Sequence, residues 1–129
     1  MNHRIAGQTQ GAPRPVGPYS QAVRVGRIVV TSGQTGVDPV TCELVGEDTE
    51  SQTCQALRNI VATLQSVRAD VTDIVQLRVF LADEGDFGGM NRVLEETLPK
   101  PYPARTTVYV GLPALVKIEI EAFAVVDDD

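Results

Sequence analysis

Histidine, cysteine and long apolar runs are scarce in this chain of 129 residues. The one histidine, His3, lies at the start of the sequence, which disfavours histidine-based catalysis and most zinc sites, so we expect no metal. The two cysteines, Cys42 and Cys54, have neither metal-ligand spacing nor a disulfide framework, and we expect reduced thiols in a cytoplasmic protein. No apolar run approaches the roughly 20 residues of a membrane span.

Basic residues are also few. Lys and Arg number 11 against 17 Asp and Glu, which gives a net charge of -6. A nucleic-acid backbone binds clustered positive charge, so we expect no nucleic-acid partner. Hydrophobic residues make up 43% of the chain, a typical globular composition. Length and composition together predict one domain over residues 1–129, with loose ends at 1–12 and 127–129.

Apolar periodicity predicts seven elements in the order β-β-α-β-α-β-β. Gly26 and Arg27 form the turn of the first hairpin, a capping box of Thr49 and Gln52 starts the first helix, and Asp86 caps the second. The predicted strands cover 22–25, 28–31, 74–81, 105–110 and 116–126, and the predicted helices cover 48–67 and 86–98.

This order predicts an α+β fold in which two helices pack on one face of a single sheet. The last strand alternates strictly, with Ile118 and Ile120 on one face and Glu119 on the other. The face without helices would expose Phe123, Tyr109 and Val125. Such a patch predicts a subunit interface.

Arg105 lies where a proline-rich connection becomes a strand, a position that holds a side chain firmly at a sheet edge. A guanidinium held there is a bidentate receptor for a carboxylate. The alternative is a surface salt bridge to Glu95 or Glu96. Spacing alone leaves both interpretations open.

Glu119 is costly in the middle of a strand if it is dry and unpaired, so it is a candidate acid or base. The alternative is an exposed strand face shared with Lys117 and Glu121. Four further residues are candidates for the lining of a site, each with ordinary packing, turn or solvent contact as the alternative: Tyr19, Ser32, Gly33 and Asn91.

Motifs spread from Gly17 to Ala124 resemble those of the Rid family, also called the YjgF family, the reactive-intermediate deaminases. The matching stretches are Gly17-Pro18-Tyr19-Ser20-Gln21-Ala22, Thr31-Ser32-Gly33-Gln34, Gln52-Thr53, Leu57-Arg58-Asn59-Ile60, Val79-Phe80-Leu81, Asp86-Phe87 with Asn91, Tyr102-Pro103-Ala104-Arg105-Thr106, and Leu112-Pro113 with Ile118-Glu119-Ile120-Glu121. Each stretch is weak alone, but the set in this order is specific.

The resemblance implies a chorismate-mutase-like fold and a homotrimer with sites between subunits. It also implies hydrolysis of reactive enamines and imines, such as 2-aminoacrylate and 2-iminopropionate, to 2-keto acids and ammonia without a cofactor. By the same resemblance, Arg105 grips the substrate carboxylate and Glu119 orients water or moves a proton. The implied lining comprises Tyr19, Ser32, Gly33, Asn91 and Thr107.

Four departures from the family pattern bear on substrate size. Thr107 stands where many active members have cysteine, and Arg68 replaces a glycine that usually follows the first helix. Thr97 and Leu98 replace an aromatic pair, and Thr35-Gly36 replaces an apolar residue and proline. Two rival functions are a carboxylate-binding or regulatory protein of the same fold and a ribonuclease or translation inhibitor. The net negative charge and the single histidine disfavour the second rival.

Overall fold

The hairpin predicted around Gly26 forms part of the sheet. In the computed structural model, which describes residues 3–127, β2 (Ala22–Val25) pairs antiparallel with β3 (Ile28–Thr31). Gly26 has a φ of 59°, a left-handed conformation that lets a two-residue turn follow the strand twist. An unpredicted strand, β1 (Ile5–Gly7), pairs with β2 inside the segment 1–12 that we expected to be loose. Residues 1–2 and 128–129, also expected to be loose, lie outside the described residues.

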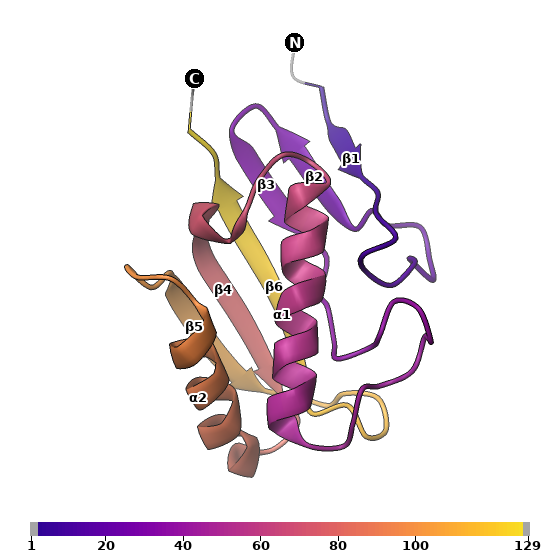
Figure 1. The fold of residues 1–129 in the computed structure, drawn as a ribbon, viewed down its shortest axis with the longest axis vertical. Coiled ribbons are helices and arrows are strands. Elements are labelled where there is room, and N and C mark those ends of the chain that lie inside the picture. Colours follow the sequence, from indigo (N-terminus) through magenta and orange to yellow (C-terminus); the bar gives the residue numbers. More distant parts are fainter. Residues whose placement is uncertain (1–2, 128–129) are drawn as a thin grey trace.

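Six strands form one mixed sheet in the order β1-β2-β3-β6-β4-β5 (Figure 1). The strands not yet named are β4 (Ile74–Leu81), β5 (Ala104–Tyr109) and β6 (Ile118–Val125). β5 runs parallel to β4, and all the other pairs are antiparallel. The predicted α+β class and element order are therefore confirmed, with β1 added at the start.

Both helices, α1 (Thr49–Gln65) and α2 (Phe87–Thr97), cover the same face of the sheet (Figure 1). Short 3-10 turns precede β4 at Val71–Asp73 and α2 at Glu84–Asp86. The core lies between this face and the helices, and its fully buried side chains include Ile60, Leu64, Leu77, Leu81, Met90, Ile118 and Ile120. Burial in β6 alternates as its sequence predicts.

The capping box predicted for α1 is wrong. Asp48 is the N-cap, and its side chain accepts a hydrogen bond of 2.9 Å from the Ser51 amide. Gln52 is fully buried and bonds instead to the backbone of Gly46, Leu115 and Lys117. A buried amide that satisfies three distant backbone groups ties α1 to the segment that leads into β6.

α1 ends in a Schellman motif whose left-handed position is occupied by Arg68, at a φ of 65°. The Ala69 amide bonds to the Leu64 carbonyl at 2.9 Å and the Arg68 amide bonds to the Gln65 carbonyl at 3.1 Å. Glycine is the usual residue there because a Cβ strains this conformation. The turn therefore keeps its geometry and carries strain at Arg68.

Asp86 occupies the N-cap position of α2 but makes no side-chain capping bond. Its Oδ1 instead accepts a hydrogen bond of 2.7 Å from the Thr49 hydroxyl, at the first residue of α1. Asp86 therefore occupies the predicted N-cap position, but the predicted capping hydrogen bond of its side chain is wrong. Asp86 joins the first turns of the two helices to each other.

The sheet face without helices exposes apolar side chains, among them Val30, Val108 and Phe123. Phe123 pairs with Val30 on the neighbouring strand, so the two side chains adjoin. Tyr109 does not belong to this patch as predicted. Its partner in β4 is Leu81, a core residue, so Tyr109 points to the helix side at the sheet edge.

Candidate functional site

Arg105 is the second residue of the edge strand β5 and pairs with Leu77 of β4. Because paired residues point to the same face, Arg105 lies on the helix side of the sheet, under α2. Its Nη1 is 3.6 Å from Met90 Sδ, and its Cζ is 5.6 Å from the centre of the Phe87 ring. A thioether and an aromatic face hold the guanidinium without neutralising its charge.

Among residues 3–127, Arg105 makes no salt bridge to a carboxylate. The alternative that paired Arg105 with Glu95 or Glu96 is therefore wrong. A guanidinium has five N–H donors, and here most of them remain available to a ligand. Planar, bidentate donors of this kind suit a carboxylate.

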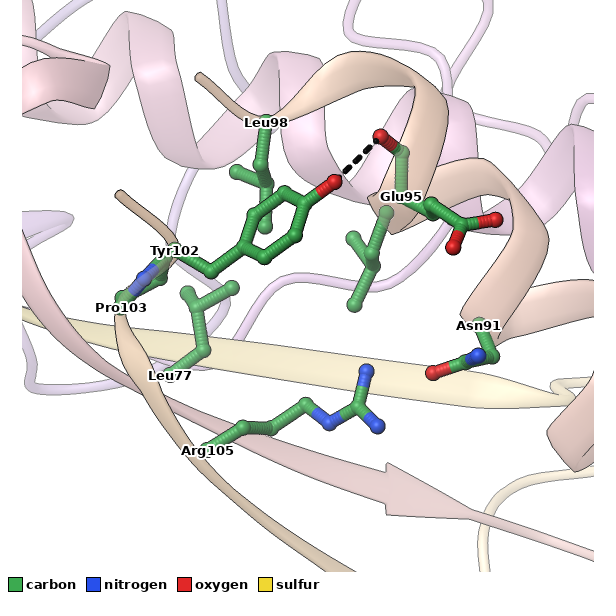
Figure 2. A pocket seen from close by; sticks show the side chains of 8 residues that line it. Leu77, Asn91, Glu95, Leu98, Tyr102, Pro103 and Arg105 are labelled. Carbon is green, nitrogen blue, oxygen red and sulfur yellow. Dashed lines mark hydrogen bonds between the residues drawn. The ribbon is translucent and has the colours of Figure 1, made fainter. Parts of the chain in front are cut away.

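Arg105 forms one wall of a cavity of about 420 Å³ between α2 and β5. Asn91 and Glu95 lie one turn apart on α2 and line the same cavity, and Figure 2 shows the Arg105 guanidinium pointing toward Asn91. The Tyr102 hydroxyl donates a hydrogen bond of 3.1 Å to the Glu95 carbonyl, which closes the far side. The remaining lining residues are Leu77, Leu94, Leu98 and Pro103.

Thr107 lies two residues beyond Arg105 on β5 and pairs with Val79. It therefore points to the helix side with Arg105 and is half-buried. The side chains of Arg105 and Thr107 therefore lie next to each other on the same face of β5. The structure thus places Thr107 on the Arg105 side of the sheet.

Glu119 lies on the opposite side of the sheet. It pairs with Phe80 of β4, and its neighbours Ile118 and Ile120 point into the core. Its side chain is half-buried. Burial raises the pKa of the Glu119 carboxyl above its ordinary value, and the charge of Glu121 adds to the rise. A raised pKa favours proton exchange nearer to neutral pH.

Gly33 packs directly against the Glu119 side chain. A Cβ at Gly33 would overlap the carboxylate and lie 2.8 Å from its Cδ, so only glycine leaves the carboxylate in this position. The loop that carries Gly33 is held by Gln34, whose amide and carbonyl both bond to Ile120 at 2.8 Å. The close approach of the loop to β6 fixes the surroundings of Glu119.

Ser32 and Tyr19 lie in segments next to Gly33. The Ser32 hydroxyl donates to the Ser20 carbonyl at 2.6 Å and so joins the end of β3 to the Tyr19 segment. The Tyr19 hydroxyl accepts a bond of 3.3 Å from the Val16 amide, and 49% of the residue is exposed. Tyr19 therefore retains its own hydroxyl proton for donation to a ligand.

Within one chain, the predicted site residues fall into two groups. The Arg105 group contains Asn91, Arg105 and Thr107 on the helix side, and the Glu119 group contains Tyr19, Ser32, Gly33 and Glu119 around the other side. The strand β4 separates β5 from β6, and Arg105 and Glu119 point to opposite faces of the sheet. Within one chain, Arg105 and Glu119 therefore do not face a common site.

Sequence reasoning missed the roles of Phe87, Met90 and Glu95 around Arg105. Phe87 and Met90 belong to the apolar stripe of α2, and helical spacing alone predicts packing for such a stripe. Phe87, Asn91 and Glu95 are spaced four residues apart, so they share one face of the helix, and Met90 adjoins them. This spacing, next to an edge strand, was the sequence signal that these residues surround Arg105. No group of three or more metal-binding side chains occurs among residues 3–127. In the same part of the chain, no helix is long and apolar enough to cross a membrane.

The chain matches the family model described as Endoribonuclease L-PSP over residues 9–126. It is 44% identical to the 2-iminobutanoate/2-iminopropanoate deaminase of Salmonella typhimurium over 129 residues, which covers 97% of this chain and 98% of the relative. It is also 44% identical to a RutC family protein of Pyrococcus abyssi over 117 residues, which covers 90% and 92% of the two chains.

Solved structures of the same family also match the chain over nearly its full length. The crystal structure of E. coli TdcF with bound serine matches with a TM-score of 0.88 and 38% identity, covering 95% of this chain and 99% of TdcF. The E. coli YjgF protein matches with a TM-score of 0.86 and 40% identity, covering 94% and 98%. Nearly full coverage at this identity establishes that the chain belongs to the Rid/YjgF/RutC family.

Proposed function

We propose that this protein hydrolyses reactive enamines and imines of the 2-aminoacrylate and 2-iminopropionate type to 2-keto acids and ammonia. The observation that carries the proposal is the Arg105 guanidinium, which lines a cavity and has no carboxylate partner within the described residues. Relatives that are about 40% identical and named 2-iminobutanoate/2-iminopropanoate deaminase support the same reaction class.

The proposed active unit is a homotrimer in which Arg105 of one subunit meets Glu119 of the next. Two observations support shared sites: the two residues point to opposite faces of the sheet, and the face of Glu119 exposes Val30 and Phe123. An apolar sheet face needs a cover, and a copy of the same chain both buries it and completes the site. The free thiols fit a cytoplasmic location.

The chemistry requires little beyond positioning. Arg105 binds the substrate carboxylate, while Glu119 accepts a proton from water as the water oxygen attacks the imine carbon. The imine nitrogen takes up that proton, which gives a carbinolamine. The hydroxyl proton of the carbinolamine then moves through the Glu119 carboxylate to the nitrogen, which leaves as ammonia while the carbon becomes the ketone of the 2-keto acid. Each turnover consumes one water and needs no redox partner, so the proposal includes no cofactor.

A dehydratase that releases 2-aminoacrylate from serine provides the direct test. We expect this protein to accelerate pyruvate formation, and Arg105→Ala to lower kcat/KM by about 100-fold or more, because two charge-assisted hydrogen bonds are lost. The loss is expected mainly in KM. Equal acceleration by Arg105→Ala would contradict the proposed role of Arg105.

Subunit mixing tests whether the site is shared. Arg105→Ala and Glu119→Gln proteins are each expected to be nearly inactive, whereas unfolding and refolding them together restores activity, up to about a quarter of the sites. Each restored site combines an intact Arg105 from one chain with an intact Glu119 from another. Mixed protein that stays inactive, or a monomeric mass by light scattering, would contradict the shared site.

A second candidate function is carboxylate binding without efficient turnover. The observation that favours it is the relative TdcF, whose crystal structure contains bound serine. The same pyruvate assay separates the two: binding of serine by calorimetry without any acceleration would support the binding protein. The ribonuclease alternative remains disfavoured by the net charge of -6, and salt-sensitive RNA binding by nuclease-free protein would revive it.

A further inference from the structure

The cavity beside Arg105 extends beyond what a carboxylate needs. Its volume of about 420 Å³ falls in the range of roughly 300–1,000 Å³ that is typical of small-molecule sites. A carboxylate on Arg105 occupies only the edge of this space. The rest is available to another part of the ligand.

The wall away from the guanidinium is apolar. The lining includes Leu98 at the end of α2 and Pro103 just before β5 (Figure 2), together with Leu77 and Leu94, whose side chains are buried. Tyr102 spans the far side, and because its hydroxyl is bonded to the Glu95 carbonyl, its ring supplies an apolar surface. These groups offer no hydrogen bond to a polar side chain and gain free energy from an aliphatic one.

Glu95 adds a charge at the rim of the cavity. Its carboxylate is exposed and has no salt-bridge partner within residues 3–127, in contrast to Glu50, which pairs with Arg92 at 2.9 Å. A second carboxylate on a ligand held by Arg105 would meet this charge. Like charges at short range are unfavourable, so Glu95 disfavours dicarboxylic ligands.

We propose that this cavity is a side-chain subsite that selects 2-imino acids with an uncharged, branched aliphatic side chain over the three-carbon imine and over dicarboxylic imines. The inference rests on the proposed deaminase function and names its substrate class. The carboxylate is held by Arg105, and the aliphatic chain lies against Leu98, Tyr102 and Pro103. Glu95 excludes a distal carboxylate.

Imines generated from alanine, leucine and glutamate by amino acid oxidases provide the test, with semicarbazide as the competing trap. We expect kcat/KM for the leucine imine to exceed that for the alanine imine by at least about tenfold, since its side chain adds three carbons and a single methylene in an apolar pocket is already worth about that factor. The glutamate imine is expected to be the poorest of the three. Equal or reversed preference between alanine and leucine imines would overturn the subsite.

Two matched pairs of variants locate the effect. Leu98→Phe narrows the cavity and is expected to lower kcat/KM about tenfold for the leucine imine and little for the alanine imine. Thr97→Phe adds the same ring one residue away. Thr97 is among the departures predicted to bear on substrate size, but it is exposed and lies outside the lining of this cavity, so this variant is the control. Glu95→Gln is expected to improve the glutamate imine about fivefold, whereas the same change at the exposed Glu96 has no effect. Equal effects within either pair would overturn the assignment.

Binding of the keto acid products separates this inference from the proposed function. If no imine is turned over, the deaminase proposal fails, but the subsite still predicts that 4-methyl-2-oxopentanoate binds more tightly than pyruvate and that Leu98→Phe removes the difference. Calorimetry measures both. Equal binding of the two keto acids would overturn the subsite even in an active enzyme.

Discussion

The Arg105 side and the Glu119 side of the sheet differ in what holds the functional group. Arg105 reaches from an edge strand under a helix, where Met90 and Phe87 contact a guanidinium that has no carboxylate partner among residues 3–127. Glu119 lies on a sheet face where burial and a neighbouring carboxylate oppose its charge. One side holds a guanidinium that is available to a ligand, and the other holds a carboxyl group whose pKa is raised.

The two faces of one sheet thus place a guanidinium and a carboxyl group in different surroundings. The helix side provides a cavity with apolar walls, which suits binding. The side without helices has an exposed apolar face, which suits contact with a second chain. On the same side, Gly33 leaves room for the Glu119 carboxylate to pack against the backbone. Substitutions on the two sides should therefore alter different kinetic constants.

The largest expected effect is on turnover at Glu119. Glu119→Gln keeps the shape of the side chain but removes the proton acceptor, so we expect kcat to fall by about 10²- to 10⁴-fold while KM changes little. Steady-state kinetics on 2-aminoacrylate measures both constants. A rise in KM with unchanged kcat would reverse the roles assigned to the two sides.

Gly33→Ala is expected to produce a smaller loss on the same side. The added Cβ overlaps the Glu119 carboxylate, which must move away, so we expect kcat to fall about tenfold. Binding of a keto acid at Arg105 is expected to be unchanged, which calorimetry measures. Loss of that binding would mean that the Glu119 side also helps to hold the ligand carboxylate, so that the two sides do not act independently.

Arg68→Gly tests a position that belongs to neither side. Glycine removes the strain of the left-handed φ of 65°, so we expect the free energy of unfolding to rise by about 1 kcal/mol. Urea denaturation measures the gain, and kinetic constants are expected to stay unchanged. A destabilised variant would show that the Arg68 side chain makes a contribution larger than its backbone strain.

The smallest expected effect is the pH dependence of stability from Glu119. Its pKa is raised in the folded state, so the folded protein binds this proton more tightly than the unfolded chain, and stability falls as the pH rises from the ordinary glutamate pKa through the raised one. Glu119→Gln should therefore stabilise the protein at neutral pH by up to about 1 kcal/mol, kept small by solvent screening. The difference in free energy of unfolding between Glu119→Gln and the unsubstituted protein should vanish in acid, where Glu119 is protonated in both states. A difference that persists in acid would instead come from side-chain packing.

Much of the fold could be predicted from local pattern. The helical spacing of Ile60 and Leu64 and the alternation of Ile118 and Ile120 determine which faces are buried, and both predictions are confirmed. The caps were predicted less well, because Thr49, Gln52 and Asp86 all bond to partners distant in sequence. A side chain with distant partners carries no local signal of its role.

The sequence by itself determined the family, the order of elements and the residue types of both sides, because motifs and periodicity are written along the chain. Only the tertiary structure decided that Arg105 and Glu119 point to opposite faces. The reason is the sheet order: β6 inserts between β3 and β4, and the register pairs Leu77 with Arg105 but Phe80 with Glu119. Register depends on long-range pairing, and a shift of one residue would have put both groups on the same face.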